Sequence, residues 1–285
     1  MYKQFSVLVC VLLVTAAACS RKDPVQPPVA KPTVTLSKEK AAIGSPLKIT
    51  YKFEVLPNAT FDADHTVFVH VLDPDGEKLW QDDHQPSVPT SQWKPGQTVE
   101  YTRTVFIPNY PYIGEAVMRL GLYNPANGRR LSLEGEASAR QEYAVKRFQL
   151  LPSSENIFLH YKEGWHPAEI DPNDPTSEWQ WTKKTGVISF RNPKRDAIFY
   201  LDWDARGDLF NPPQQITVSV GGQPLATFTA NAKNRTLNEI PVTAAQFGDG
   251  DMAEITIDVD RTFAPGGTDI RELGIRVFHA FVEPK

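Results

Sequence analysis

The sequence predicts an all-β protein made of two immunoglobulin-like antiparallel β-sandwiches in series. Short apolar alternations separated by turn residues fill most of the chain from Thr33 onward, which is typical of sandwich strands. No amphipathic pattern runs longer than about two helical turns. With 285 residues, of which 41% are hydrophobic, the chain is long enough to bury one or two cores.

The first sandwich is predicted over residues 33–149. Its clearest strand is 46–55, where alternation places five side chains on one face: Leu47, Ile49, Tyr51, Phe53 and Val55. A strand at 66–72 runs into the turn Asp73-Pro74-Asp75-Gly76 and returns as a hairpin partner at 78–81. Further strands are expected at 98–107 and 116–122.

The second sandwich is predicted over residues 150–285 and is interpreted as a domain that resembles carbohydrate-binding domains. Seven candidate strands over this length are enough for one sandwich: 186–190, 197–203, 215–220, 225–230, 238–242, 253–259 and 275–282. Gly221-Gly222 between two of them is a two-residue hairpin signal. No internal repeat links the two halves, so two different sandwiches are expected.

Residues 1–18 have the pattern of a signal peptide: a charged start, an apolar run and three alanines before Cys19. The run is too short for a membrane span, which needs about 20 apolar residues. The segment resembles the lipobox of bacterial lipoproteins, although Ala16 stands where that family usually has leucine. The resemblance implies palmitate-type acylation of Cys19, and Ser20 next to it favours outer-membrane sorting. An ordinary secretory signal cleaved near Ala18 is the alternative.

Removal of the signal peptide and acylation would leave no free thiol, because the only cysteines are Cys10 and Cys19. The mature chain would then have no disulfide, no thiolate nucleophile and no cysteine metal site. Residues 19–32 contain four prolines and are predicted to be a semi-extended tether. A formal charge of −4 gives no attraction to nucleic acid or anionic lipid, so the predicted membrane contact is the lipid anchor alone.

Two groups of residues resemble a chemical site, one a glycosidase carboxylate pair and the other a metal site. Asp202 and Asp204 would share one face of a strand like a glycosidase pair, but neighbouring Arg206 and Asp208 favour a solvated strand end. A cluster without tight ligand spacing gives only a weak metal signal: His65, His70, Asp82, Asp83 and His84. The chain is therefore predicted to be no enzyme, with no catalytic residue, no bound metal and no cofactor.

The aromatic residues of the second block carry the strongest functional signal. Four tryptophans gather in its first part, and the middle two would share one face of a strand: Trp165, Trp179, Trp181 and Trp203. Indole faces stack on the apolar faces of sugar rings, so these are the candidate glycan-binding residues. Core packing of most of them is the alternative, because sandwich tryptophans are often core residues.

Both blocks resemble the extracytoplasmic β-domains appended to bacterial membrane glycosyltransferases. The motifs that carry the resemblance are turns and core positions: 67–76 (VFVHVLDPDG), 89–96 (PTSQWKPG), 121–125 (GLYNP), 164–169 (GWHPAE), 179–182 (WQWT), 260–265 (DRTFAP) and 269–274 (DIRELG). The sequence lacks the polytopic membrane domain and catalytic acidic residues of those transferases, so the resemblance implies proximity to envelope glycan and no glycosyl transfer.

Together these features predict a non-catalytic lipoprotein of the cell envelope, anchored in a membrane, with the outer membrane favoured. Its expected role is to bind glycan or to assist envelope polysaccharide assembly. The alternative is a protein-interaction or structural module of an envelope complex that binds no glycan. In that case the tryptophans should be buried, and their replacement should lower stability instead of affinity.

Overall fold

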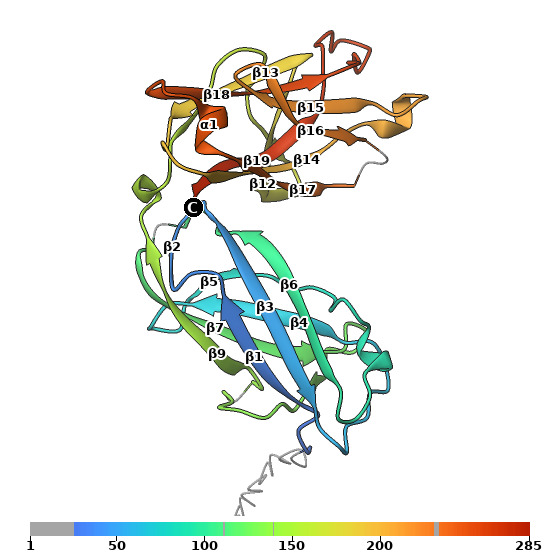
Figure 1. The fold of residues 1–285 in the computed structure, drawn as a ribbon. Coiled ribbons are helices and arrows are strands. Elements are labelled where there is room, and N and C mark those ends of the chain that lie inside the picture. Colours follow the sequence, from blue (N-terminus) through green and yellow to red (C-terminus); the bar gives the residue numbers. More distant parts are fainter. Residues whose placement is uncertain (1–25, 111, 139, 231–233) are drawn as a thin grey trace, which may run out of the picture.

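The computed structural model describes residues 26–285 except for 111, 139 and 231–233, and it contains two β-sandwiches in series (Figure 1). The predicted all-β fold is confirmed. The predicted signal peptide and lipidation site Cys19 lie outside the described residues. Within the described part of the chain, no helix has the length and apolar character needed to cross a membrane.

The first sandwich packs a three-stranded sheet against a six-stranded one. The smaller sheet has the order β1 (Ala30–Leu36), β3 (Pro46–Val55) and β6 (Thr98–Phe106). The larger has the order β2 (Lys40–Ala42), β9 (Tyr143–Leu151), β7 (Gly114–Tyr123), β4 (Thr66–Leu72) and β5 (Lys78–Gln81), with β8 (Arg130–Leu131) paired to β7. These pairs are antiparallel except β2 with β9. The five side chains expected on one face of β3 are all buried in the core between the sheets.

Both predicted boundaries of this sandwich shift by a few residues. Strand β1 begins at Ala30, inside the predicted tether 19–32, because Ala30 pairs with Val55 and is fully buried. Pro32 is tolerated there because β1 is an edge strand. At the other end β9 continues past the predicted boundary at 149, and buried Leu150 belongs to the first core.

The second sandwich packs two five-stranded sheets. One has the order β10 (Leu159–Tyr161), β13 (Thr185–Arg191), β18 (Met252–Val259), β15 (Gln215–Val220) and β16 (Gln223–Thr229). The other has the order β11 (Glu169–Asp171), β12 (Asp174–Trp181), β19 (Arg276–Pro284), β14 (Ala197–Asp204) and β17 (Thr236–Val242). The seven predicted strands are present, and β10, β11 and β12 are additional. The short helix α1 (Ala244–Phe247) follows β17.

The sheet that contains β12, β14, β17 and β19 turns its outer face toward the first sandwich (Figure 1). Among the described residues, two ion pairs join the sandwiches: Lys38 to Glu283 at 2.6 Å and Lys48 to Glu239 at 2.5 Å. The ring of Phe106 at the end of β6 stacks on His279 of β19, with 4.2 Å between ring centroids. The outer face of this sheet is therefore partly covered by the first sandwich at one end.

Candidate functional site

Two of the four predicted tryptophans lie together on this outer sheet face. Trp179 and Trp181 are two positions apart on β12, and Trp181 pairs directly with Arg276 of the neighbouring strand β19. The Arg276 guanidinium lies 5.0 Å from the Trp179 ring centroid and 5.7 Å from that of Trp181. Its distance to the Phe278 ring is 5.4 Å. Cation–π attraction and strand pairing therefore hold one arginine among three aromatic rings.

The alternation of aromatic and cationic side chains continues toward the first sandwich. The Arg235 guanidinium lies 4.1 Å from the Phe278 ring centroid, and one of its nitrogens is 3.2 Å from Nδ1 of His279. His279 in turn stacks on Phe106. We call this set the aromatic–arginine row; its members are Trp181, Trp179, Arg276, Phe278, Arg235 and His279.

Two buried carboxylates lie beneath the row. Asp204 accepts a hydrogen bond from Nε of Arg276 at 2.7 Å, and Asp202 accepts one from Nε of Arg235 at 2.8 Å and another from His279 at 2.9 Å. Burial acts to raise the pKa of Asp202, but the hydrogen bonds from Arg235 and His279 outweigh it and hold that pKa below its ordinary value. The pair shares one face as predicted.

The expected solvated strand end is nevertheless wrong. Asp202 and Asp204 are only 6% and 4% exposed, because each is covered by its arginine. A glycosidase acid must hold a proton at working pH, and a carboxyl group paired with a guanidinium favours the ionised form. The geometry of this pair gives structural support to the two arginines, and the lowered pKa of Asp202 is the opposite of what a glycosidase acid needs.

The row is accessible enough to meet a ligand. The exposed fraction of the side chain is 44% for Arg235, 41% for His279 and 31% for Arg276. The rings of Trp179 and Phe278 are half-buried. The two guanidinium charges are balanced by the two aspartates. Nε1 of Trp179 is buried without a hydrogen-bond partner in the described part of the structure, so this indole offers a ligand its ring face and not its N–H group. Chemically, the row offers flat rings and fixed N–H donors with little net charge.

The other two predicted tryptophans are structural. Trp203 is 4% exposed and points into the core because it alternates with Asp202 and Asp204; its Nε1 donates to Asn238 at 2.7 Å. A stacking role for Trp203 is therefore wrong. Trp165 packs half-buried against the same core, edge-on to Tyr161, and its Nε1 donates to the carbonyl of Val187 at 2.9 Å. Neither side chain belongs to the row.

Four members of the row escaped prediction: Arg276, Phe278, Arg235 and His279. The signal that could have identified two of them is the spacing of Arg276 and Phe278, which are two positions apart at the start of the predicted last strand. Their placement beside Trp179 depends on the pairing of β12 with β19, which no local pattern reveals.

The histidines and aspartates of the weak metal signal do not gather at one point, although His84 and Asp82 lie 3.5 Å apart. His70 lies 3.5 Å from Glu142, and burial is the main cause that lowers the pKa of His70. His84 shares a 2.8 Å hydrogen bond with the Tyr101 hydroxyl, while Asp82 pairs with Arg103 at 2.9 Å. Among the residues that the structure describes, no three histidine, cysteine or acidic side chains are arranged to hold a metal ion.

Comparisons with known proteins give only remote similarity. No family model and no curated protein matches the chain. Among solved structures, a β-glucuronidase from Bacteroides uniformis is 9% identical with a TM-score of 0.33, over 89% of this chain and 30% of that one. An isomalto-dextranase from Arthrobacter globiformis complexed with panose is 11% identical with a TM-score of 0.27, over 84% of this chain and 35% of that one.

A third match is the M60 catalytic domain of Clostridium perfringens ZmpB with its CBM51 domains, at 10% identity and a TM-score of 0.26. It covers 85% of this chain and 34% of that one. The chain thus spans about a third of the length of each of these three solved chains. At TM-scores of 0.26 to 0.33, these similarities assign neither a ligand nor a reaction to this chain.

Proposed function

We propose that this protein is a non-catalytic lipoprotein of the cell envelope whose second sandwich binds a glycan along the aromatic–arginine row. The observation that carries the proposal is the half-buried Trp179 ring held between Arg276 and Phe278 on an open sheet face. A sugar ring has an apolar face that stacks on such a ring, and its hydroxyl groups accept hydrogen bonds from guanidinium N–H groups.

The span of the row favours an extended ligand. Its members come from β12, from β19 and from Arg235 just before β17, so the row spans several segments of the sheet and also runs along β19. Adjacent strands lie about 4.8 Å apart, so the groups on β12 and β19 lie side by side over several residues of both strands. A linear polysaccharide segment fits this arrangement better than a single compact sugar.

A structural role of the row is the competing proposal, in which the protein is an interaction module of an envelope complex. Phe106 of the first sandwich caps the row at His279, and Trp181 is only 9% exposed. A row that served only as a brace between the sandwiches would show this same contact. The two proposals differ in the expected effect of removing the Trp179 ring: glycan binding predicts a loss of affinity, and a structural role predicts a loss of stability.

Trp179→Ala is expected to lower glycan affinity at least about tenfold while the protein stays folded, because the stacking ring is lost and the core is not. The measurement is binding of the detergent-solubilised full chain to a panel of purified envelope polysaccharides, with circular dichroism to verify folding. Trp80→Ala is the matched control, since Trp80 is a half-buried tryptophan of the first sandwich. Equal affinity of Trp179→Ala and the original protein, or no binding to the whole panel, would reject glycan binding.

The proposed lipid anchor rests on the lipobox-like motif before Cys19. In bacterial cells that make lipoproteins, the mature N-terminal peptide is expected to begin at Cys19 and to carry the added mass of its acyl chains. Two or more chains make membrane anchoring stable, so Cys19→Ser should move the protein from the membrane to the soluble fraction. A mature peptide that begins at Cys19 without added mass would show an ordinary secretory signal instead.

A further inference from the structure

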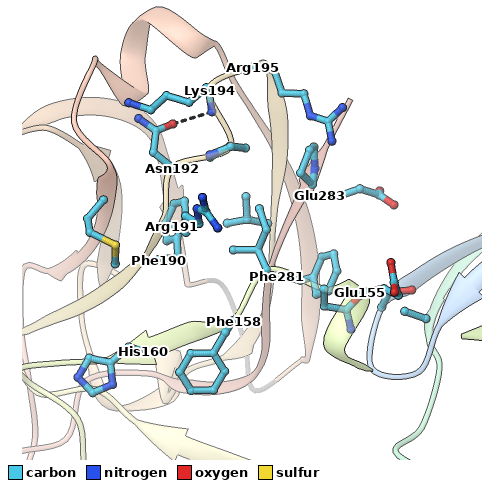
Figure 2. A pocket seen from close by; sticks show the side chains of 18 of the residues that line it. Glu155, Phe158, His160, Phe190, Arg191, Asn192, Lys194, Arg195, Phe281 and Glu283 are labelled. Atoms are coloured by element: carbon cyan, nitrogen blue, oxygen red, sulfur yellow. Dashed lines mark hydrogen bonds between the residues drawn. The ribbon is translucent and has the colours of Figure 1, made fainter. Parts of the chain in front are cut away.

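A cavity of about 1170 Å³ lies where the two sandwiches and the segment between them meet. The first sandwich contributes Lys38 and Lys40, the connecting segment contributes Phe158, and the second sandwich contributes the turn from Arg191 to Arg195. Figure 2 shows Lys194 and Arg195 on one side of this hollow and Phe158 and His160 on the other, with Arg191 between them. Small-molecule sites are frequent at such junctions between domains. No member of the aromatic–arginine row lines it.

The cavity has an excess of positive charge although the chain as a whole is acidic. Five cationic side chains line it, against three carboxylates: Lys38, Lys40, Arg191, Lys194 and Arg195, against Glu155, Asp251 and Glu283. Lys38 is paired with Glu283 at 2.6 Å, and Lys194 lies 3.8 Å from Asp251. Within the described residues, Lys40, Arg191 and Arg195 make no ion pair. Such a cavity concentrates anions.

The turn that carries the two arginines is rigid. The side chain of Asn192 is buried and donates to the carbonyls of Gly248 and Gly250, both at 2.9 Å, and its oxygen accepts from the backbone N–H of Lys194 at 2.9 Å. Lys194 adopts a left-handed backbone conformation with φ of 56°, which this side chain stabilises. Arg191 and Arg195 therefore project from a preorganised turn, which reduces the entropy lost on binding.

The size and the aromatic lining indicate more than an inorganic ion. Ligand pockets typically span roughly 300 to 1,000 Å³, so a small anion would leave most of this volume empty. Phe158 is 81% exposed at the cavity, and a phenylalanine so exposed offers a flat apolar face. His160 and Asn156 also line the cavity and add polar groups. The complementary ligand has carboxylates, hydroxyl groups and a ring with an apolar face.

We propose that this cavity is a binding site for a carboxylated oligosaccharide, with its carboxylates at Arg191, Arg195 and Lys40 and a sugar ring on Phe158. Guanidinium groups bind carboxylates through paired, charge-assisted hydrogen bonds. The site is separate from the aromatic–arginine row and needs no glycan there. A uronate oligomer supplies all three chemical features, whereas an acidic peptide lacks the stacking ring and would use the cations alone.

The test is calorimetric titration of the full chain with tetragalacturonate, compared with the same oligosaccharide after its carboxyl groups are reduced to alcohols. Tetragalacturonate is expected to bind at least about tenfold more tightly than the reduced form, and added salt should weaken it by screening. Arg191→Gln/Arg195→Gln should lower that affinity at least about tenfold. Both side chains are exposed, so the fold should persist. Arg147→Gln, an exposed arginine of the first sandwich, is the matched control.

Further variants separate this site from the row. Phe158→Ala should weaken tetragalacturonate binding, and Trp179→Ala should leave it unchanged. The proposal is overturned if tetragalacturonate does not bind, if the reduced oligosaccharide binds equally well, or if Trp179→Ala removes the binding. Tighter binding of a hexaglutamate peptide than of tetragalacturonate would assign the cavity to an acidic peptide and overturn the saccharide assignment.

Discussion

Gly164→Ala is expected to lower the free energy of unfolding of the second sandwich by about 3 kcal/mol or more, through a clash and backbone strain together. A Cβ atom at this position would lie 1.6 Å from the carbonyl oxygen of Thr185 and 2.7 Å from its carbon. The atoms in the way are backbone of β13, which no side-chain rotation can move. The φ angle of 76° adds the strain of a left-handed conformation.

The close approach at Gly164 exists because the segment around it is hydrogen-bonded to the sheet on both sides. The carbonyl of Gly164 accepts from Lys183 at 2.7 Å, and the neighbouring Glu163 carbonyl accepts from Val187 at 2.9 Å. Moving the segment outward to admit a methyl group would break these bonds. It would also lift Trp165 from the core, because its indole follows directly in the chain.

Gly222→Ala is the matched control for this prediction. Gly222 has a φ angle of 75°, but a Cβ atom there meets nothing within 4 Å. Its replacement should therefore lower stability only by the conformational strain, about 1 kcal/mol. Chemical denaturation followed by tryptophan fluorescence measures both variants, since four tryptophans report on the second sandwich. Similar losses for the two variants would show that the contact with Thr185 is unimportant.

Most of the fold could be predicted because its strands alternate clearly. In β3 every second residue from Leu47 to Val55 is apolar and buried, so the local pattern and the tertiary structure agree. The Gly221-Gly222 hairpin between β15 and β16 was predictable because two glycines permit positive φ angles. Strands β10 and β11 have three residues each, which is too short for a periodic signal.

The candidate site was predictable only in part. Because residues two positions apart on a strand share a face, the sequence correctly placed Trp179 with Trp181, and Asp202 with Asp204. This spacing could not show which face is buried or which side chains of the neighbouring strands lie beside it. Arg276 is 72 positions from Asp204, and the pairing of β14 with β19 alone brings them together. The cavity at Arg191 could not be predicted from local sequence patterns, because residues of both sandwiches line it.

Arg276→Met is expected to lower the free energy of unfolding of the second sandwich by about 3 kcal/mol, because it leaves the buried carboxylate of Asp204 without its cation. The methionine side chain keeps apolar contact with Trp179 and Phe278, so packing loss contributes little. Arg235→Met should have a smaller effect. Its partner Asp202 retains the 2.9 Å hydrogen bond from His279, and Arg235 itself is 44% exposed.

The double variant Asp204→Asn/Arg276→Met tests whether the stability lost in Arg276→Met comes from the unpaired charge of Asp204 or from the loss of the arginine side chain itself. If the loss in Arg276→Met arises from an unpaired buried charge, removal of that charge in the double variant should restore most of the stability, since a buried pair as a whole adds little net stability. Denaturant unfolding of both single variants and the double variant gives the coupling energy. Additive losses would show that the two side chains act independently. A strong coupling would establish that Asp204 holds Arg276 in place beside Trp179, so the aspartate positions the ligand-facing arginine without touching the ligand.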